Sequence, residues 1–131
     1  MRYLYFLILT LLIASCSNDF KKYEEIGLFK IYELQCDGKF YMTIEDCSCK
    51  NLPENYFTPK GDKNDNFYEF YVRLKDDRIK IYSLYDEFQT FGDIKSKVDF
   101  IVFQNNAEFI EFRESYDLKI FRGYLHGNMN P

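Results

Sequence analysis

The residue types that could carry chemistry in this chain are four cysteines, one histidine and 21 acidic side chains. Cysteine and histidine together could hold zinc, or could act as a nucleophile and its base. The spacing of Cys36, Cys47 and Cys49 matches none of the usual zinc patterns, and His126 lies among Gly and Asn residues near the end of the sequence. We therefore expect no metal, no cofactor and no catalytic residue.

Two further patterns resemble parts of catalytic or metal sites without completing them. Asp76-Asp77 is a pair of carboxylates of the kind that glycoside hydrolysis requires, but it lies in a predicted turn. Asp62, Asn64 and Asn66 imitate the opening of a calcium loop, and Phe67 then stands where that loop requires glycine. The sequence therefore predicts a protein that is not an enzyme.

The first sixteen residues have the features of a secretory signal. Arg2 supplies a positive charge, residues 3–13 (YLYFLILTLLI) are almost wholly apolar, and the small residues Ala14 and Ser15 precede Cys16. A charged start, an apolar run of about 7–15 residues and small exit residues describe a cleaved signal peptide. The run is too short for a membrane-spanning helix, which needs about 20 residues.

The exit sequence Ile13-Ala14-Ser15-Cys16 resembles the lipobox of bacterial lipoproteins. The resemblance implies that the Cys16 thiol receives a diacylglycerol, that the chain is cut just before it, and that the new amino group is acylated. Two or more acyl chains anchor a protein stably, so we expect a cell-envelope protein that contacts the membrane through its lipid. Ser17 is not the aspartate that retains many such proteins at the inner membrane in enterobacteria, which favours the outer membrane, facing the periplasm or the surface. The alternative is an N-terminal core strand or helix that contains a buried cysteine.

The chain that remains after cleavage is long enough for one domain. We expect a signal peptide at 1–15, a lipidated anchor and tether at 16–27, a β-domain at 28–125 and a tail at 126–131. Residues 18–27 could instead form one short helix. Because Arg2 is removed, cleavage leaves 16 of the 17 basic residues against 21 acidic ones, a net charge of −5. This balance argues against nucleic acid as a partner, since nonspecific binding to nucleic acid depends on clustered cations.

Three cysteines remain beside the lipidated one, and export places them where disulfides persist. Cys36 lies next to a predicted turn at Asp37-Gly38, and the strand residues between Lys39 and Cys47 span roughly 25 Å. A disulfide needs Cα atoms closer than about 7 Å, so we expect no Cys36–Cys47 bond. A bond from Cys36 to Cys49 requires the chain to double back, and a bond from Cys47 to Cys49 would close a strained small ring.

Two β-hairpins are the clearest elements of the sequence. Segments 28–36 and 39–46 flank Asp37-Gly38, and segments 67–75 and 78–85 flank Asp76-Asp77. Two-residue turns of this kind between alternating segments are typical of hairpins. In the first hairpin the register gathers apolar residues on one face: Phe29, Ile31, Phe40, Met42 and Ile44. In the second hairpin the apolar face holds Tyr68, Phe70, Val72, Leu74, Ile79, Ile81 and Tyr85.

The remaining segments predict further strands and connections. We expect a loop at 50–66, an ambiguous segment at 86–97 that is a short strand or a turn of helix, and strands at 98–103, 107–113 and 117–122. Both faces of 98–103 are largely apolar, which suits a central strand or a strand inside a closed barrel. About seven strands with polar turns indicate an all-β domain, either a small antiparallel meander barrel or a sandwich.

One segment of the first hairpin resembles a known family. Residues 32–44 (YELQCDGKFYMTI) look like the opening hairpin of the lipoprotein inhibitors of c-type lysozyme, with an aromatic residue, a cysteine, a turn glycine and an alternating strand. The resemblance implies a small envelope β-barrel that inserts a loop into the lysozyme cleft. The later serine-glycine-aromatic segment and the closing C-terminal cysteine of that family are missing, so no functional residue is carried over.

The second hairpin also predicts a candidate binding patch. Six side chains fall on the face opposite its apolar residues, and we expect them to be exposed. These residues are Tyr71, Arg73, Lys75, Arg78, Lys80 and Tyr82. Like charges directly opposite each other cost stability, and tyrosines are enriched at protein interfaces. The alternative is an ordinary solvated face with lysines that protect an edge from aggregation.

These observations together favour a non-enzymatic lipoprotein whose β-domain binds another envelope component or an incoming protein. A protective inhibitor or an immunity lipoprotein would be one form of this function. The alternative is a barrel-type carrier of a small apolar ligand, because the 14 Phe and 12 Tyr residues could line a cavity as well as fill a core.

Overall fold

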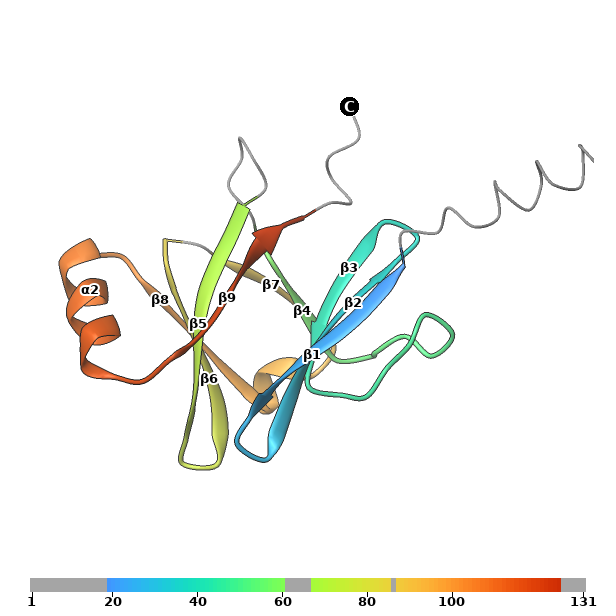
Figure 1. The fold of residues 1–131 in the computed structure, drawn as a ribbon, viewed down its shortest axis with the longest axis horizontal. Helices are drawn as coiled ribbons and strands as arrows, with labels where there is room; N and C mark the ends of the chain where they lie inside the picture. Colours follow the sequence, from blue (N-terminus) through green and yellow to red (C-terminus); the bar gives the residue numbers. More distant parts are fainter. Residues whose placement is uncertain (1–18, 61–66, 86, 126–131) are drawn as a thin grey trace, which may run out of the picture.

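The computed structural model describes residues 19–60, 67–85 and 87–125. These residues form two β-sheets that pack on each other, with one α-helix on the outer side of the second sheet (Figure 1). The all-β prediction is confirmed, and of the two architectures expected the structure is a sandwich. The barrel that the resemblance to lysozyme inhibitors implies is therefore not the fold of these residues.

The first sheet has five strands in the order β1-β2-β3-β4-β7, and all of its neighbours are antiparallel. Its strands are β1 (Phe20–Ile26), β2 (Phe29–Cys36), β3 (Lys39–Thr43), β4 (Tyr56–Pro59) and β7 (Phe88–Phe91). The second sheet has the order β8-β6-β5-β9, with β8 parallel to β6. Its strands are β5 (Phe67–Lys75), β6 (Arg78–Leu84), β8 (Val98–Phe103) and β9 (Lys119–Tyr124). The 3-10 helix η1 (Ile94–Ser96) precedes β8, and the α-helix α2 (Asn106–Ser115) joins β8 to β9.

Both predicted hairpins are present, and their registers are confirmed. Cys36 pairs with Lys39 across the first turn, and Lys75 pairs with Arg78 across the second. All four turn residues have positive φ: Asp37 50°, Gly38 75°, Asp76 53° and Asp77 58°. Positive φ at both central residues defines the type I′ turn, whose twist matches that of the flanking strands.

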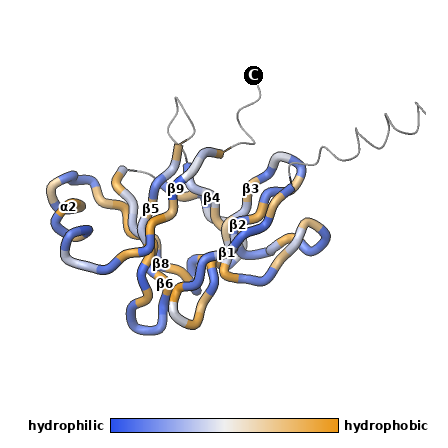
Figure 2. The backbone as a smooth tube through the Cα atoms, viewed as in Figure 1, coloured by the Kyte–Doolittle hydropathy of each residue, from blue (hydrophilic) through white to orange (hydrophobic). Residues whose placement is uncertain are grey.

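The main core lies between the two sheets. The fully buried residues that fill it come from both sheets and include Ile31, Met42, Phe57, Phe70 and Ile81. Hydrophobic and hydrophilic positions alternate along the strands, as Figure 2 shows, so one face of each sheet is directed inward. The expected apolar faces of both hairpins are confirmed, except that Tyr85 has φ of 61° and is exposed.

The expected tether or short helix at 18–27 is wrong in its described part, because Phe20–Ile26 form β1. Gly27 has φ of 61° and begins a two-residue turn of type II′, which folds β1 back onto β2. The strand lacks an alternating apolar pattern because it lies at the edge of the sheet and only Ile26 is buried. Lys22 on its inner face instead forms an ion pair with Glu33, at 2.9 Å between Nζ and Oε2.

The meander expected after the second hairpin is also wrong. The chain leaves β6 for β7 in the other sheet and returns as β8, so β8 runs parallel to β6 at the edge of its sheet rather than at the centre. The strand expected at 107–113 is helix α2. The Asn105 carboxamide oxygen caps this helix by accepting hydrogen bonds from the backbone N–H of Ala107 and Glu108.

One smaller expectation is corrected by the structure, because the loop expected at 50–66 contains β4. The segment at 86–97, expected to hold a short strand or a turn of helix, contains the short strand β7 and the 3-10 helix η1. Several expectations fall outside the described residues. They are the signal peptide with Cys16, the calcium-like residues Asp62, Asn64 and Asn66, and the tail at 126–131 with His126.

Candidate functional site

The six residues of the predicted binding patch share one face of the β5–β6 hairpin. Tyr71 lies opposite Tyr82 and Arg73 opposite Lys80, as expected. The exposure expected for the two tyrosines is wrong, because helix α2 covers them. Tyr71 is 2% exposed and Tyr82 is 6% exposed.

Aromatic contacts hold the helix on this face. The Phe109 ring lies 5.4 Å from the Tyr71 ring, and the Phe112 ring lies 4.3 Å from the Tyr82 ring, measured between centroids. The two phenylalanines are three residues apart, so both point from one side of the helix toward the sheet. The tyrosines therefore belong to a second apolar cluster between helix and sheet.

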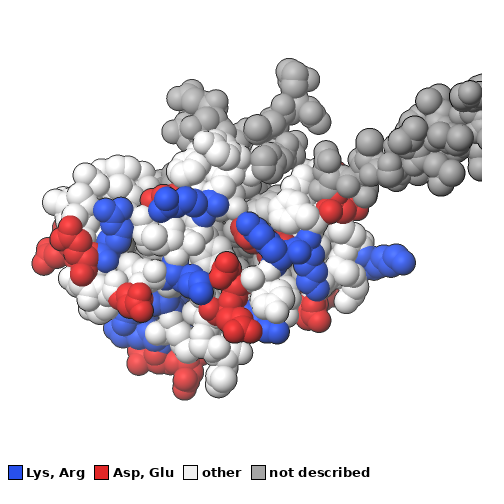
Figure 3. Space-filling model, viewed as in Figure 1, with Lys and Arg blue, Asp and Glu red and all other residues white. Residues whose placement is uncertain are grey.

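Two of the four cations in the patch are paired with one carboxylate on β8. Asp99 accepts hydrogen bonds from Arg78 at 2.8 Å and from Lys80 at 2.9 Å. These donors hold the pKa of Asp99 at about 2, below its ordinary value of 3.8. Figure 3 shows the wider pattern, in which cationic and anionic side chains are interspersed over the visible face. The patch as expected from the sequence is thus partly buried and partly neutralised.

A polar network lies where the helix meets β5. The Tyr71 hydroxyl donates to Glu69 Oε1 at 2.7 Å and accepts from Arg113 at 3.2 Å. Burial, with the hydrogen bond to Glu69, raises the pKa of Tyr71. Arg122 on β9 pairs with the same carboxylate at 3.3 Å. Each charged group of the network has a partner within the chain, so we assign it a structural role.

The remaining two cations of the patch, Arg73 and Lys75, take part in none of the ion pairs among the described residues. Lys75 is exposed. The Arg73 guanidinium lies over the ring of Tyr116, with its carbon 4.0 Å from the centroid. Tyr116 directly follows α2 and is about half exposed.

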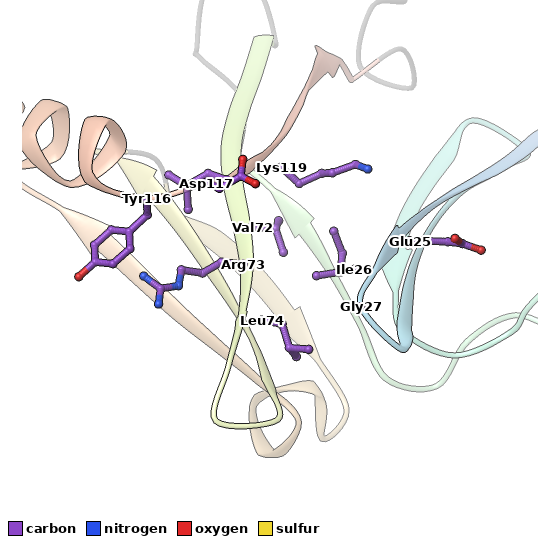
Figure 4. Close-up of a pocket in the computed structure, with 10 residues that line it drawn as sticks. Glu25, Ile26, Gly27, Val72, Arg73, Leu74, Tyr116, Asp117 and Lys119 are labelled. Atoms are coloured by element: carbon purple, nitrogen blue, oxygen red, sulfur yellow. The ribbon is translucent and has the colours of Figure 1, made fainter.

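Arg73 and Tyr116 line an open groove of about 450 Å³, which we call the β5-edge groove (Figure 4). Lys75 follows Leu74, the last residue of β5 in this lining. The floor of the groove is the C-terminal half of β5. One wall is the β1–β2 turn, and the other is the connection from α2 to β9. The lining residues are Glu25, Ile26, Gly27, Val72, Arg73, Leu74, Tyr116, Asp117, Leu118 and Lys119.

The groove has two chemically different sides. Val72, Leu74 and Ile26 point into the space between β5 and the β1–β2 turn, whereas Arg73 points the other way, toward Tyr116 (Figure 4). Leu28 follows Gly27 at the tip of the turn and is 99% exposed. The groove therefore has mostly buried apolar side chains on its inner side and Arg73 on its outer side, with the exposed Leu28 beside it. Its walls also carry two carboxylates, Glu25 and Asp117. Its other cation, Lys119, pairs with Glu24.

Sequence reasoning found Arg73 but missed the two walls of the groove. The connection at Tyr116 was hidden because α2 was expected to be a strand. The helical signal was present, since Phe109, Phe112 and Tyr116 are spaced by three and four residues. Asn105 followed by Glu108 is also a typical helix start.

The three described cysteines comprise one disulfide and one free thiol. Cys36 and Cys49 are joined by a disulfide, and Cys47 is a buried free thiol. Burial raises the pKa of the Cys47 thiol, which disfavours the reactive thiolate. The expectation that Cys36 does not bond to Cys47 is confirmed. Residues 44–49 turn the chain back on itself. Cys49, two residues after Cys47, therefore bonds to Cys36 instead.

Among the described residues, no group of three or more His, Cys, Asp or Glu side chains is placed to hold a metal ion. The helices in this part of the chain are also too short and too polar to cross a membrane. Comparison of the chain with protein-family models, with curated proteins and with solved structures finds no match.

Proposed function

We propose that this protein is a lipoprotein of the bacterial cell envelope, held at the membrane by a lipid on Cys16, whose β-domain binds a protein partner without catalysing a reaction. The proposed membrane location rests on the apolar run and on the Ile13-Ala14-Ser15-Cys16 sequence that ends it. The outer membrane, facing the periplasm or the surface, is the location we infer from Ser17. A protective inhibitor or an immunity protein would be one form of this function.

The observation that carries the binding function is the β5-edge groove. It combines an apolar inner side, the Arg73 side chain, which has no carboxylate partner among the described residues, and the fully exposed Leu28 beside it. Exposed apolar groups beside a hollow are typical of protein interaction sites. The main core, by contrast, is filled by side chains such as Phe57 and Phe70, both fully buried, so no observation favours the carrier of an apolar ligand.

The membrane anchor is tested by Cys16→Ser. We expect the wild type to incorporate a fatty-acid analogue and the variant to accumulate as an unprocessed, unlabelled precursor. Equal label in both proteins would show that Cys16 is not the anchor.

The binding function is tested by crosslinking in cells. A photoreactive amino acid at Leu28 places the probe at the rim of the groove, and the same substitution at Leu52 is a matched control at an exposed leucine on another loop. We expect an adduct with a second protein from position 28 only, identified by mass spectrometry. Absence of an adduct at position 28, or equal adducts at both positions, would contradict a partner at the groove.

A further inference from the structure

The floor of the β5-edge groove is a strand edge that no described strand covers. On one side β5 pairs with β6 from Tyr71 to Lys75. On the other side it pairs with β9, but only from Phe67 to Val72. The chain diverges from β5 before Lys119, because Tyr116 and Asp117 lead back to the helix on the outer face. Beyond Val72, the side of β5 that faces away from β6 therefore has no strand paired to it among the described residues, and we call it the open edge of β5.

The ladder shows which backbone groups this edge offers. Lys75 and Arg78 flank the two-residue turn, and residues in that position form a hydrogen-bonded pair. Because the direction of the backbone groups alternates along a strand, the N–H and C=O of Leu74 point away from β6. They point to the side where β9 has ended. The groove thus presents one backbone donor and one backbone acceptor to an incoming strand.

The side chains around this edge determine which residue types an added strand should have. A residue placed opposite Leu74 would have its side chain on the inner side, beside Leu74 and Ile26. Residues placed opposite Arg73 and Lys75 would project outward beside these two cations, neither of which has a carboxylate partner among the described residues. An apolar residue between two acidic ones matches Leu74 between these two cations. The carboxylates of the groove lining, Glu25 and Asp117, belong to its walls and not to β5.

We propose that the β5-edge groove binds an extended segment of the partner by adding it as a strand to the open edge of β5, and that this segment alternates acidic and apolar residues. The inference rests on the proposed protein-binding function and specifies its partner. In strand addition, backbone hydrogen bonds supply affinity and alternate side chains supply specificity. Leu28 and Tyr116 at the rim would contact the flanking residues of the segment.

The charges argue against a second copy of the chain as the occupant. An antiparallel pairing of two β5 edges centred on Leu74 would place Arg73 of each copy directly opposite Lys75 of the other. Four cations would then gather without a carboxylate between them, and like charges directly opposite destabilise a sheet.

The test measures binding of synthetic peptides to the full chain in detergent by fluorescence anisotropy. The probe is a blocked seven-residue peptide in which glutamate and valine alternate. A second peptide has lysine in place of each glutamate, and a third carries N-methyl groups on its valines. Since the chain has a net charge of −4, general attraction would favour the lysine peptide. A preference for the glutamate peptide therefore reports the local cations.

We expect the glutamate peptide to bind at least tenfold more tightly than either of the other two. The double variant Arg73→Glu with Lys75→Glu should lose at least tenfold in affinity for it, while Lys50→Glu, at an exposed lysine outside the groove, should leave the affinity unchanged. Equal binding of the N-methylated peptide would overturn the strand pairing. Equal binding of the lysine peptide would overturn the acidic specificity.

The backbone donor is tested from the protein side by Leu74→Pro, which removes the N–H that faces the groove but no hydrogen bond of the β5–β6 ladder. Its control is Leu74→Ala, which removes the side chain alone. We expect the proline variant to bind the glutamate peptide at least tenfold more weakly than the alanine variant. Should the proline variant not fold, the N-methylated peptide tests the same hydrogen bonds from the side of the ligand.

The crosslink from position 28 separates failure of this inference from failure of the proposed function. If the crosslinked protein is still captured by the Arg73→Glu, Lys75→Glu variant and no peptide binds, the binding function stands and strand addition is wrong. If no crosslinked protein is found, the function itself is wrong. Dimerisation of the chain through this edge, detected by sedimentation and lost in Leu74→Pro, would replace the partner by a second copy.

Discussion

The hydroxyl of Tyr68 on β5 donates a hydrogen bond of 2.8 Å to Oε1 of Glu33 on β2, across the space between the two sheets. Glu33 is only 3% exposed, and its other carboxylate oxygen pairs with Lys22. A buried carboxylate needs each of its partners, because the low-polarity interior does not replace a lost hydrogen bond. This contact therefore joins the two sheets through a buried polar bond beside the apolar core.

We predict that Tyr68→Phe lowers the free energy of unfolding by about 1–3 kcal/mol, because a buried acceptor loses a donor. Urea denaturation measures the change. Tyr124→Phe is the matched control, since Tyr124 is about half exposed. Equal stability of Tyr68→Phe and wild type would contradict a structural role for this bond.

The same tyrosine predicts how stability depends on alkaline pH. Burial, with the nearby Glu33 carboxylate, raises the pKa of Tyr68 above its ordinary value of 10.0. In the unfolded chain the hydroxyl loses its proton near pH 10, whereas in the folded chain it keeps it. The contribution of this group is thus present below about pH 10 and is lost as the pH rises further. Tyr68→Phe should show a shallower loss of stability above pH 10.

Asp99 predicts the behaviour at acidic pH. Its pKa is about 2 in the folded protein, against an ordinary value of 3.8. Below about pH 4 the unfolded chain binds a proton that the folded chain does not, so stability falls as the pH drops from about 4 to about 2. We expect Asp99→Asn to flatten this part of the curve, measured by urea denaturation at each pH. Asp77→Asn, at an exposed carboxylate in a turn, should retain the slope; a slope retained by both variants would contradict the prediction.

The cap of helix α2 gives a further prediction. Asn105→Ala removes the side chain that accepts hydrogen bonds from two backbone N–H groups, and should cost about 1 kcal/mol of stability. Asn106→Ala, one position inside the helix, should cost less, because this side chain makes no capping bond. Thermal denaturation compares the two variants. An equal loss of stability in both variants would show that the Asn105 cap does not stabilise the helix.

The Cys36–Cys49 disulfide leads to predictions about the stability of the protein and about which cysteines are joined. Removing it with Cys36→Ser and Cys49→Ser opens a link across 13 residues and should lower the unfolding free energy by about 2–4 kcal/mol. Cys47→Ala keeps the disulfide and serves as the control. In the wild type we expect the Cys47 thiol to react with thiol reagents only after unfolding, because it is buried. Peptide mapping under non-reducing conditions that joins Cys36 to Cys47 would contradict the structure.

The parts of the fold that could be predicted from the sequence are those with local signals. Asp37-Gly38 and Asp76-Asp77 tolerate positive φ, and the segments around them alternate, so turn and register follow from neighbouring residues. β1 gave no such signal, because Lys22 and Glu24 stand where an alternating strand would have inward apolar residues, and only Ile26 is buried. Lys22 instead pairs with Glu33, directly opposite on β2. The helix was missed because its apolar residues do not keep to one face. Ile110 and Phe112 alternate with polar residues as in a strand, and only Phe109 is buried.

The candidate site could be predicted only in part, for a related reason. The face shared by Tyr71, Arg73 and Lys75 follows from the hairpin alone. The burial of this face by α2 does not follow from the hairpin, because it depends on the path of the chain after β8. The groove depends on the β1–β2 turn and the α2–β9 connection, which are distant in the sequence. No local pattern reports that β9 stops pairing at Val72 and leaves the edge of β5 open.

The short stretch of chain between Cys16 and the first residue of β1 limits how far from the membrane the proposed partner could bind. Phe20 is four residues after Cys16, and a chain reaches at most about 3.6 Å per residue, so a lipid on Cys16 would hold Phe20 within roughly 14 Å of the anchoring residue. β1 then runs about 20 Å to the turn that forms one wall of the groove. The β1–β2 turn would therefore lie at most about 34 Å from Cys16, the sum of these two lengths, which is an upper limit on the distance between this wall of the groove and the anchor. Only proteins that are embedded in the same membrane, or that approach its surface closely, would come within reach.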